Sequence, residues 1–276
     1  MNTFRKGVPK PTLVGAGAPN PKKGAVNIIY ADDVEYFPPR DENGILMVGN
    51  IVLRANAKVV TVYHTPTTQK GSHTTEGDED AEQIKQKFEG SVPGDELEVN
   101  EFEQNALGQG FIILYGTSCG SNSNKCLGTP CNPMKLKGEF TDDKDGVKRM
   151  FTFEQLQGGR QLAGIYTGSL SFAANFNVPL VTTVVVSPDN GNVYQLPATA
   201  VEASVTFTGM TQTHGQIISL VGGGGVGPSV LHASAAAPAT VLLANGADWV
   251  AIAGAIINLR VFIAGATKYL IEVSRK

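Results

Sequence analysis

The three cysteines are the residues of this chain with the clearest capacity for chemistry, because thiols bind zinc, pair as disulfides or act as nucleophiles. Cys119, Cys126 and Cys131 fall in one loop that is rich in Ser, Asn and Gly. A structural zinc site uses four ligands, commonly in closely spaced pairs, and this loop offers neither. The spacing therefore argues against a metal centre and leaves one local disulfide open.

Catalytic residues are not grouped in the sequence. The four histidines are scattered: His64, His73, His214 and His232. Ser118 precedes Cys119 but has no histidine near it in sequence to act as its base. Because no nucleophile, base and orienting group can be placed together, we expect that the protein is not an enzyme. We also expect no cofactor and no metal.

Glycine amides can wrap a phosphate, which draws attention to Gly222–Gly227 (GGGGVG). A phosphate-binding loop continues with Lys-Ser or Lys-Thr and then a helix. Here Pro228 and Ser229 follow, inside a region with strand patterns. The segment is therefore interpreted as a flexible loop between strands.

Thr141–Gly146 (TDDKDG) has the composition of a calcium-binding loop. Such a loop starts with an aspartate and supplies a bidentate glutamate at its twelfth position. In this sequence Thr141 stands first, and Thr152 occupies the place of the glutamate. Asp, Lys and Gly in this order are typical of a turn, so we interpret the segment as a hairpin turn.

This turn lies in the middle of Pro133–Gln155, where apolar and polar residues alternate on both sides. Alternation with a period of two predicts a β-hairpin with one apolar and one charged face. We expect the apolar face to cover a core and the charged face to meet water or another subunit. No catalytic grouping lies near it.

The first part of the chain otherwise contains short strand patterns, one helix and a long polar stretch. The helix is predicted at Asp95–Leu107, where acidic residues favour the start and Gly108 ends it. Thr65–Gln83 is expected to be a surface loop that serves as a contact arm. The expected strands are Ala25–Tyr30, a pair formed by Ile45–Arg54 and Val59–Tyr63, a strand that contains Ile84 and Phe88, the fully apolar Gly110–Gly116, and Ala163–Leu170.

The chain is predicted to form two domains, since 276 residues exceed the usual length of one. Only eight charged residues follow Phe172, and their signs cancel, so the net charge of -3 belongs to the first part. Asn175–Pro179 is the expected linker. Seven short strands are predicted after it: Val181–Ser187, Val193–Leu196, Val201–Thr208, Ile217–Val221, Thr240–Leu243, Ile256–Phe262 and Tyr269–Val273.

The predicted fold class is mainly β. Residues 25–172 are expected to form a β-sandwich with one flanking helix, and residues 178–276 a small β-sandwich or barrel. No membrane insertion is expected, because Trp249–Leu259 is too short to span a bilayer and is interrupted by Gly254. The first residues contain no continuous apolar core, so no secretory signal is expected.

Residues 1–24 alternate prolines and glycines with basic residues, a composition that cannot fold alone. We expect an extended arm that binds a neighbouring subunit during assembly. The residues proposed for this contact are Phe4, Arg5, Lys6, Pro9 and Pro11.

With these elements in place, the region from Ala25 to Leu170 resembles the major tail tube protein of long-tailed bacteriophages. The resemblance rests on the strand pair with its long loop, on the helix DELEVNEFEQNAL and on the hairpin PMKLKGEF…VKRMFTFEQL. The stretch from Gly246 to Arg275 is similar to C-terminal modules of phage virion proteins such as head fibres, which decorate particle exteriors.

The resemblance implies a structural virion protein that forms hexameric rings, which stack into the tube through which DNA leaves the capsid. It implies copies of the same chain and other tail proteins as partners, and DNA that passes without specific binding. The implied location is the virion tail, assembled in the host cytoplasm.

A channel that releases DNA works best if its wall does not bind phosphates, and acidic side chains repel them. We therefore hypothesise that some acidic residues of the first domain face the channel. The candidates are Glu76, Asp78, Glu79, Asp80, Glu82, Glu139, Asp142 and Asp143.

Two other classes of protein stay open. A capsid decoration or head-fibre protein would use the same β-rich C-terminal part. A carbohydrate-binding module would need exposed aromatic residues along a groove, but most aromatic residues after Phe172 lie in strand patterns typical of a core. This last alternative is therefore the least favoured.

Overall fold

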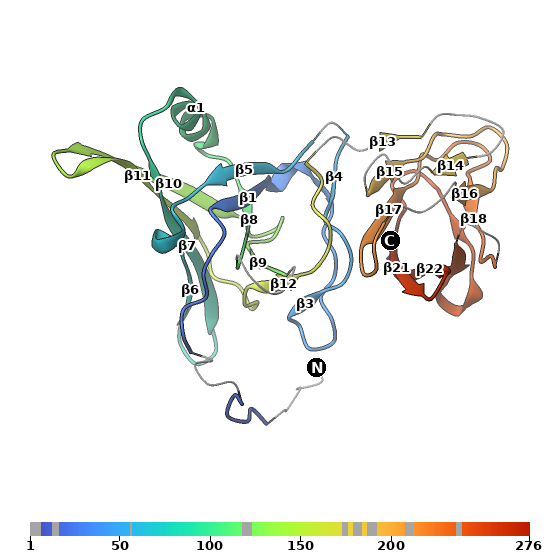
Figure 1. Ribbon diagram of the computed structural model, residues 1–276, viewed down its shortest axis with the longest axis horizontal. Coiled ribbons are helices and arrows are strands. Elements are labelled where there is room, and N and C mark those ends of the chain that lie inside the picture. Colours follow the sequence, from blue (N-terminus) through green and yellow to red (C-terminus); the bar gives the residue numbers. More distant parts are fainter. Residues whose placement is uncertain are drawn as a thin grey trace. The chain divides into compact units, whose positions relative to one another are not determined.

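The computed structural model describes residues 7–12, 17–55, 57–117, 123–172, 176–178, 184–186, 192–207, 212–235 and 239–276. In this part the chain is mainly β, with 48% strand, 8% helix and a single α-helix (Figure 1). The predicted fold class is confirmed at this level. The chain divides into two compact units. The first unit consists of Met1–Ile28, Arg40–Leu46 and Thr61–Tyr166. The second unit consists of Ile29–Pro39, Met47–Val60 and Thr167–Lys276.

The largest sheet has ten strands and a mostly linear order, β3-β12-β9-β8-β10-β11-β7-β6, with β1 paired to β5 and β8. Its strands are β1 (Ala25–Tyr30), β3 (Leu46–Met47), β5 (Val60–Tyr63), β6 (Lys70–Glu76), β7 (Gln83–Pro93), β8 (Phe111–Gly116), β9 (Asn124–Leu127), β10 (Met134–Asp143), β11 (Gly146–Gln155) and β12 (Gly164–Tyr166). Two short strands, β2 (Val34–Tyr36) and β4 (Val52–Leu53), pair with each other. The 3-10 turns η1 (Ala31–Asp33) and η2 (Pro66–Thr68) complete these segments.

The strand pair predicted from Ile45–Arg54 and Val59–Tyr63 is wrong. Strands do form in both segments, but β4 pairs with β2 and β5 pairs with β1. Local apolar runs predict that a strand exists but carry no information on its partner, which is chosen by the packing of the whole sheet. The predicted strands Ala25–Tyr30 and Gly110–Gly116 are confirmed by β1 and β8, and Phe111–Leu114 is buried throughout as expected.

The predicted hairpin is confirmed by β10 and β11, which pair from Met134 with Gln155 to Asp143 with Gly146. The predicted helix is confirmed by α1 (Leu97–Ala106), and Gly108 follows it with a positive φ of 77°. Helix α1 packs on one face of the hairpin through Phe102, whose ring lies 5.9 Å from that of Phe151.

The expectation that one face of this hairpin covers a core holds only for half of its length. Phe151 and Phe153 are fully buried, whereas Phe140 and Val147 are 43% and 38% exposed. The reason is length: β7 pairs with β11 only as far as Lys148, so the hairpin tip extends past the rest of the sheet (Figure 1).

The second unit contains a six-stranded sheet in the order β13-β15-β17-β21-β22-β19. These strands are β13 (Phe176–Asn177), β15 (Val193–Gln195), β17 (Ile217–Val221), β21 (Ile256–Ala264), β22 (Thr267–Arg275) and β19 (Thr240–Leu242). Two further pairs are β14 (Val184–Val186) with β16 (Val205–Phe207) and β18 (Val230–Leu231) with β20 (Trp249–Val250), and η4 (Ala244–Gly246) is a 3-10 turn. Each of the seven strands expected after the linker overlaps an observed strand, because short apolar runs between turn residues are a direct signal of buried strands.

The core of this unit is formed by aromatic and aliphatic side chains, including Tyr194, Ile218 and Trp249. These three side chains are 0%, 0% and 3% exposed.

Gly222–Gly227 is a packed segment and not an open anion-binding loop. The N–H groups of Gly222, Gly224 and Gly227 donate to backbone carbonyls at 2.7, 2.9 and 3.1 Å. A Cβ atom at Gly223 would lie 2.2 Å from the carbonyl oxygen of Leu196. The glycines are therefore required for close contact between backbone segments, and these three amides are not available to a phosphate.

Candidate assembly surface

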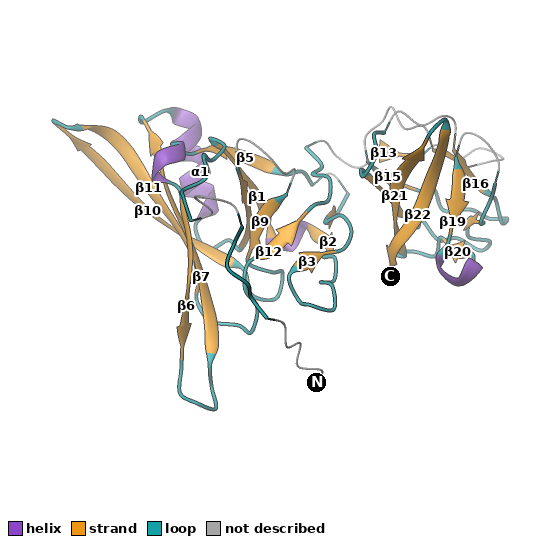
Figure 2. Cartoon of the chain, turned by 60° about the horizontal axis from the view of Figure 1, so that its bottom comes forward, coloured by secondary structure: helices purple, strands orange, loops and turns teal. Residues whose placement is uncertain are grey.

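Four antiparallel strands in the order β10, β11, β7 and β6 form a long ribbon, and the name ribbon is used for them below (Figures 1 and 2). Strand β6 lies within the stretch Thr65–Gln83, for which a surface loop was expected, and that expectation is wrong. Its seven residues pair with β7 from Lys70 with Glu89 to Glu76 with Gln83. The sequence signal is weak because β6 is polar on both faces, so the alternation that marks a strand is absent.

Strand β6 is the last strand of the sheet, and within the described residues it pairs with β7 alone. His73, Thr74, Thr75 and Glu76 are all exposed. An edge strand presents a row of backbone N–H and C=O groups to solvent, and such a row can pair with another chain.

The hydrogen bonds of Ile84 show which groups of β6 point outward. Ile84 donates its N–H to the carbonyl of Gly159 at 2.6 Å and accepts from the Gly159 N–H at 2.8 Å, both on the side away from β6. Ile84 is opposite Thr75. In an antiparallel pair of strands, opposite residues alternate between pairs that are hydrogen-bonded to each other and pairs that are not. Because the N–H and C=O of Ile84 point away from β6, Ile84 and Thr75 form a pair without hydrogen bonds. The N–H and C=O of Thr75 therefore point away from β7. By alternation His73 and Gly71 present their groups at the same free edge.

The structure separates the eight candidate acidic residues into two groups. Glu76, Asp78, Glu79, Asp80 and Glu82 lie at the turn between β6 and β7, and Glu139, Asp142 and Asp143 lie near the turn between β10 and β11. All eight are exposed. The two turns are at opposite ends of the ribbon, and β7 alone spans about 33 Å between them at the usual rise per residue. The candidates therefore do not form one acidic patch.

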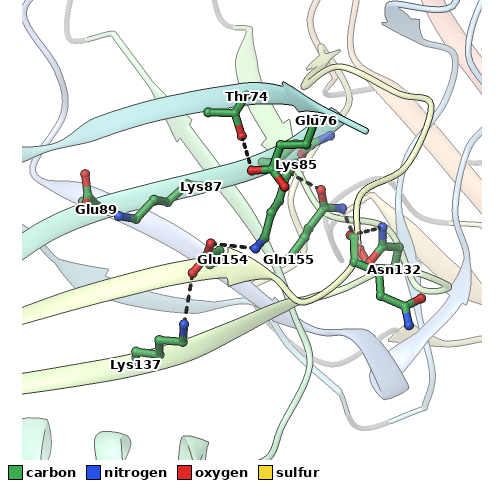
Figure 3. A network of polar contacts seen from close by, with 11 residues as sticks. Thr74, Glu76, Lys85, Lys87, Glu89, Asn132, Lys137, Glu154 and Gln155 are labelled. Carbon is green, nitrogen blue, oxygen red and sulfur yellow. Dashed lines mark hydrogen bonds and ion pairs between the residues drawn. The ribbon is translucent and has the colours of Figure 1, made fainter. Parts of the chain in front are cut away.

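Between these ends the ribbon carries a set of alternating charges, several of which are drawn in Figure 3. Glu154 alternates along β11 with Phe151 and Arg149, which contact α1, so these charges lie on the face opposite the helix. Glu154 lies between Lys85 and Lys137, each 3.1 Å away. Glu89 lies between Lys87 at 2.6 Å and Lys70 at 3.7 Å. We call these six residues the lysine–glutamate ladder.

The ladder places ammonium groups outermost. Side-chain exposure is 71% for Lys70 and 64% for Lys137, against 24% for Glu89 and 23% for Glu154. The hydrogen bond from Lys87 lowers the pKa of Glu89, and that from Lys85 lowers the pKa of Glu154, so both carboxylates stay ionised. The ladder was not predicted, although Lys85, Lys87 and Glu89 have the period of two that puts side chains on one strand face.

The opposite face of the ribbon holds α1 through Arg149 of β11. Its guanidinium donates to the carboxylate of Asp95 at 2.6 Å and forms further short contacts with Glu103 and Asn100. It also lies 4.5 Å from the ring of Phe140. The hydrogen bond from Arg149 is the main cause that lowers the pKa of Asp95. One nearly buried cation therefore fixes the helix, the hairpin and an aromatic ring in place.

The residues considered for chemistry do not assemble into a site in the described part of the chain. Cys126 is buried and Cys131 exposed, and both are free; Cys119 and Ser118 lie outside the described residues. Burial raises the pKa of Cys126 to about 12, which keeps it a thiol. No group of three or more His, Cys, Asp or Glu side chains that could hold a metal is found among the described residues.

His64 is a core residue, fully buried between the rings of Phe88 and Phe151. Its Nδ1 lies 3.2 Å from the carbonyl oxygen of Val62, and its Nε2 has no hydrogen-bond partner among the described residues. Burial lowers its pKa to about 4. The ring is therefore neutral at pH 7 and acts as packing.

Of the proposed arm residues, Pro9 and Pro11 are exposed, and Phe4, Arg5 and Lys6 lie outside the described residues. The arm joins the sheet at Lys22, which forms a bridge with Thr117 and donates its ammonium to the carbonyl of Gln69. Among the helices described, none is long and apolar enough to cross a membrane.

Comparison with known proteins yields no relative on which to base a function. No family model matches the chain, and neither the curated proteins nor the solved structures contain a significant match.

Proposed function

We propose that this chain is a structural virion subunit that assembles through its sheet edges into hexameric rings, which stack into a tail tube for the passage of DNA. The observation that carries the proposal is the free edge of β6, where Gly71, His73 and Thr75 offer backbone groups to a neighbouring strand. A ring forms when the edge of one copy pairs with a different edge of the next, since such a contact repeats around an axis.

The finer architecture belongs to the same proposal. Residues 25–172 would form the tube wall as a β-sandwich with α1 on one side, and residues 178–276 would form a small β-sandwich or barrel that decorates the tube. Residues 1–24 would bind a neighbouring ring. Other tail proteins would bind the finished tube, and the location would be the virion tail after assembly in the host cytoplasm.

The hypothesis that the candidate acidic residues face the channel has to be modified. Because Glu76 and Asp142 lie at opposite ends of the ribbon, a channel wall that includes both has to run along its whole length. That wall then includes the ladder, in which Glu89 and Glu154 each neutralise one of two neighbouring lysines. DNA would meet acidic ends that repel its phosphates and, between them, a ladder in which four lysines outnumber two glutamates. The repulsion that the channel needs would therefore come from the two acidic ends.

A capsid decoration or head-fibre protein is the second candidate. Its support is the part of the chain after Phe172, whose strands and few charges suit a compact module displayed on a particle. Such a protein would occur as monomers or trimers and would not need the free edge of β6.

Electron microscopy of the purified full-length protein in negative stain tests the proposal. Rings or hollow tubes are expected. The variant Thr75→Pro removes an outward N–H and leaves the pairing with β7 intact, so it should abolish rings without lowering the melting temperature. Thr75→Val keeps the N–H and serves as the matched control. Monomers or trimers at high concentration in the unaltered protein would contradict the tube and favour decoration.

A further inference from the structure

The free edge of β6 has a basic and an acidic end. Lys70 is the first residue of the strand. The ammonium group of Lys22 lies next to it, because it donates a hydrogen bond to the carbonyl of the preceding residue, Gln69. Glu76 ends the strand, and four more acidic residues follow in the turn: Asp78, Glu79, Asp80 and Glu82. An edge with this polarity is complementary to itself when two copies run antiparallel, and it repels itself when they run parallel.

The register of such a pair follows from the groups that point outward. Gly71, His73 and Thr75 have to form the hydrogen-bonded pairs, so His73 faces His73 of the second copy and Gly71 faces Thr75. All seven residues of β6 are then paired. Lys70 falls opposite Glu76 of the second copy, and the two-fold axis repeats this contact.

Lys70 and Glu76 also suit this contact by position. Both direct their N–H and C=O groups toward β7. Across the outer edge they therefore face each other as a non-hydrogen-bonded pair, and in such pairs the side chains approach most closely. Both point to the same face of the ribbon as the ladder. The acidic turn of one copy would extend past Lys70 of the other, toward the position of Lys22.

We infer that the edge of β6 binds a second copy of this chain as an antiparallel two-fold dimer in the register Lys70 to Glu76. The dimer closes on itself, so it covers the edge and stops further growth. The dimer would be a storage form of the subunit that precedes ring assembly, and this role rests on the proposed function. The existence of the dimer does not depend on the proposed function.

Sedimentation velocity of the full-length protein over a range of concentrations at low salt tests the inference. The unaltered chain is expected to show a monomer–dimer equilibrium. Lys70→Glu alone, or Glu76→Lys alone, turns both symmetry-related contacts into like-charge pairs and should weaken the dimer by about tenfold or more. The double variant Lys70→Glu/Glu76→Lys restores opposite charges and should recover the dimer.

Two controls separate this contact from general effects of charge and folding. Asp145→Lys makes the same charge change as Glu76→Lys at the far end of the ribbon and should leave the dimer unchanged. Thr75→Pro should abolish the dimer while thermal melting stays the same. The inference is overturned if the unaltered chain stays monomeric at all concentrations, if the double variant remains as weak as the single ones, or if Asp145→Lys weakens association equally.

The same measurements distinguish this inference from the proposed function. Dimers that recover in the double variant, without rings in the microscope, would support the two-fold contact and contradict the tube. Rings that form equally well in the single and double variants, with no dimer at lower concentration, would support the tube and contradict the two-fold contact.

Discussion

Arg149 of β11 donates a hydrogen bond to Asp95, 2.6 Å from Nη2 to Oδ1, and thereby ties the segment that leads into α1 to the β10–β11 hairpin. Its other nitrogen contacts Glu103 of the same helix. The two carboxylates would repel each other without the guanidinium between them. Arg149 thus supplies the charged part of the docking of α1, beside the apolar contact of Phe102 with Phe151.

Arg149→Met should release α1 while retaining most of the apolar volume of the side chain. The two carboxylates then lose their shared partner, and we expect the melting temperature to fall by roughly 5 °C. Hydrogen exchange of the α1 amides should rise in the same variant. Lys148→Met, an exposed neighbour on the other face of β11, is the control and should change neither quantity. Equal effects of both substitutions would refute the specific role of Arg149.

His64 makes folding sensitive to acid. Its pKa is about 4 in the folded protein against 6.5 when unperturbed, so the unfolded chain binds the proton more tightly. Its contribution is therefore fully present above pH 6.5 and is lost as the pH falls from 6.5 to about 4, by about 3 kcal/mol in total. Urea denaturation at pH 7 and at pH 4.5 measures the loss.

The variant His64→Leu should reduce this acid dependence, because it has no group to protonate. His73→Gln changes an exposed histidine of β6 and should leave the dependence as it is. If the unaltered protein and His64→Leu lose stability equally between the two pH values, other groups are responsible.

The two described cysteines should differ in reactivity. Cys126 is fully buried and its pKa is raised to about 12, whereas Cys131 is exposed. A maleimide added to the folded protein at pH 7 should therefore label Cys131 and leave Cys126 unmodified. Peptide mapping by mass spectrometry reads the result, and labelling of Cys126 in urea is the positive control. Rapid labelling of Cys126 in the native protein would contradict its burial.

Gly223 should tolerate no side chain. A Cβ atom there would lie 2.2 Å from the carbonyl oxygen of Leu196, so backbone has to move, and Gly223→Ala should cost more than about 2 kcal/mol of stability. Gly254→Ala is the matched control: it lies in open space but has a φ of 76°, and should cost about 1 kcal/mol from backbone strain alone. Denaturation midpoints of the two variants test the difference, and similar costs would show that close packing is not the reason for Gly223.

Elements whose signal is local could be predicted from the sequence. Alternation around a turn predicted the β10–β11 hairpin, acidic residues and a closing glycine predicted α1, and short apolar runs predicted seven of the ten strands described after Phe172. The short strands β13, β18 and β20 were not predicted. These patterns are reliable because the period of side-chain direction belongs to the strand or helix itself and needs no knowledge of partners.

Which strands are neighbours and which edge is free could not be predicted and follow only from the folded sheet. Residues Val60–Tyr63 pair with β1 and not with the preceding segment, and the polar β6 is a strand only because β7 supplies its hydrogen bonds. The arrangement of charges also depends on strand pairing. The candidate acidic residues lie at two opposite ends of the ribbon, and Lys137 contacts Glu154, which is 17 positions away in the sequence. Pairing between strands is a long-range choice made by the packing of the whole sheet, and no local pattern in this sequence records it.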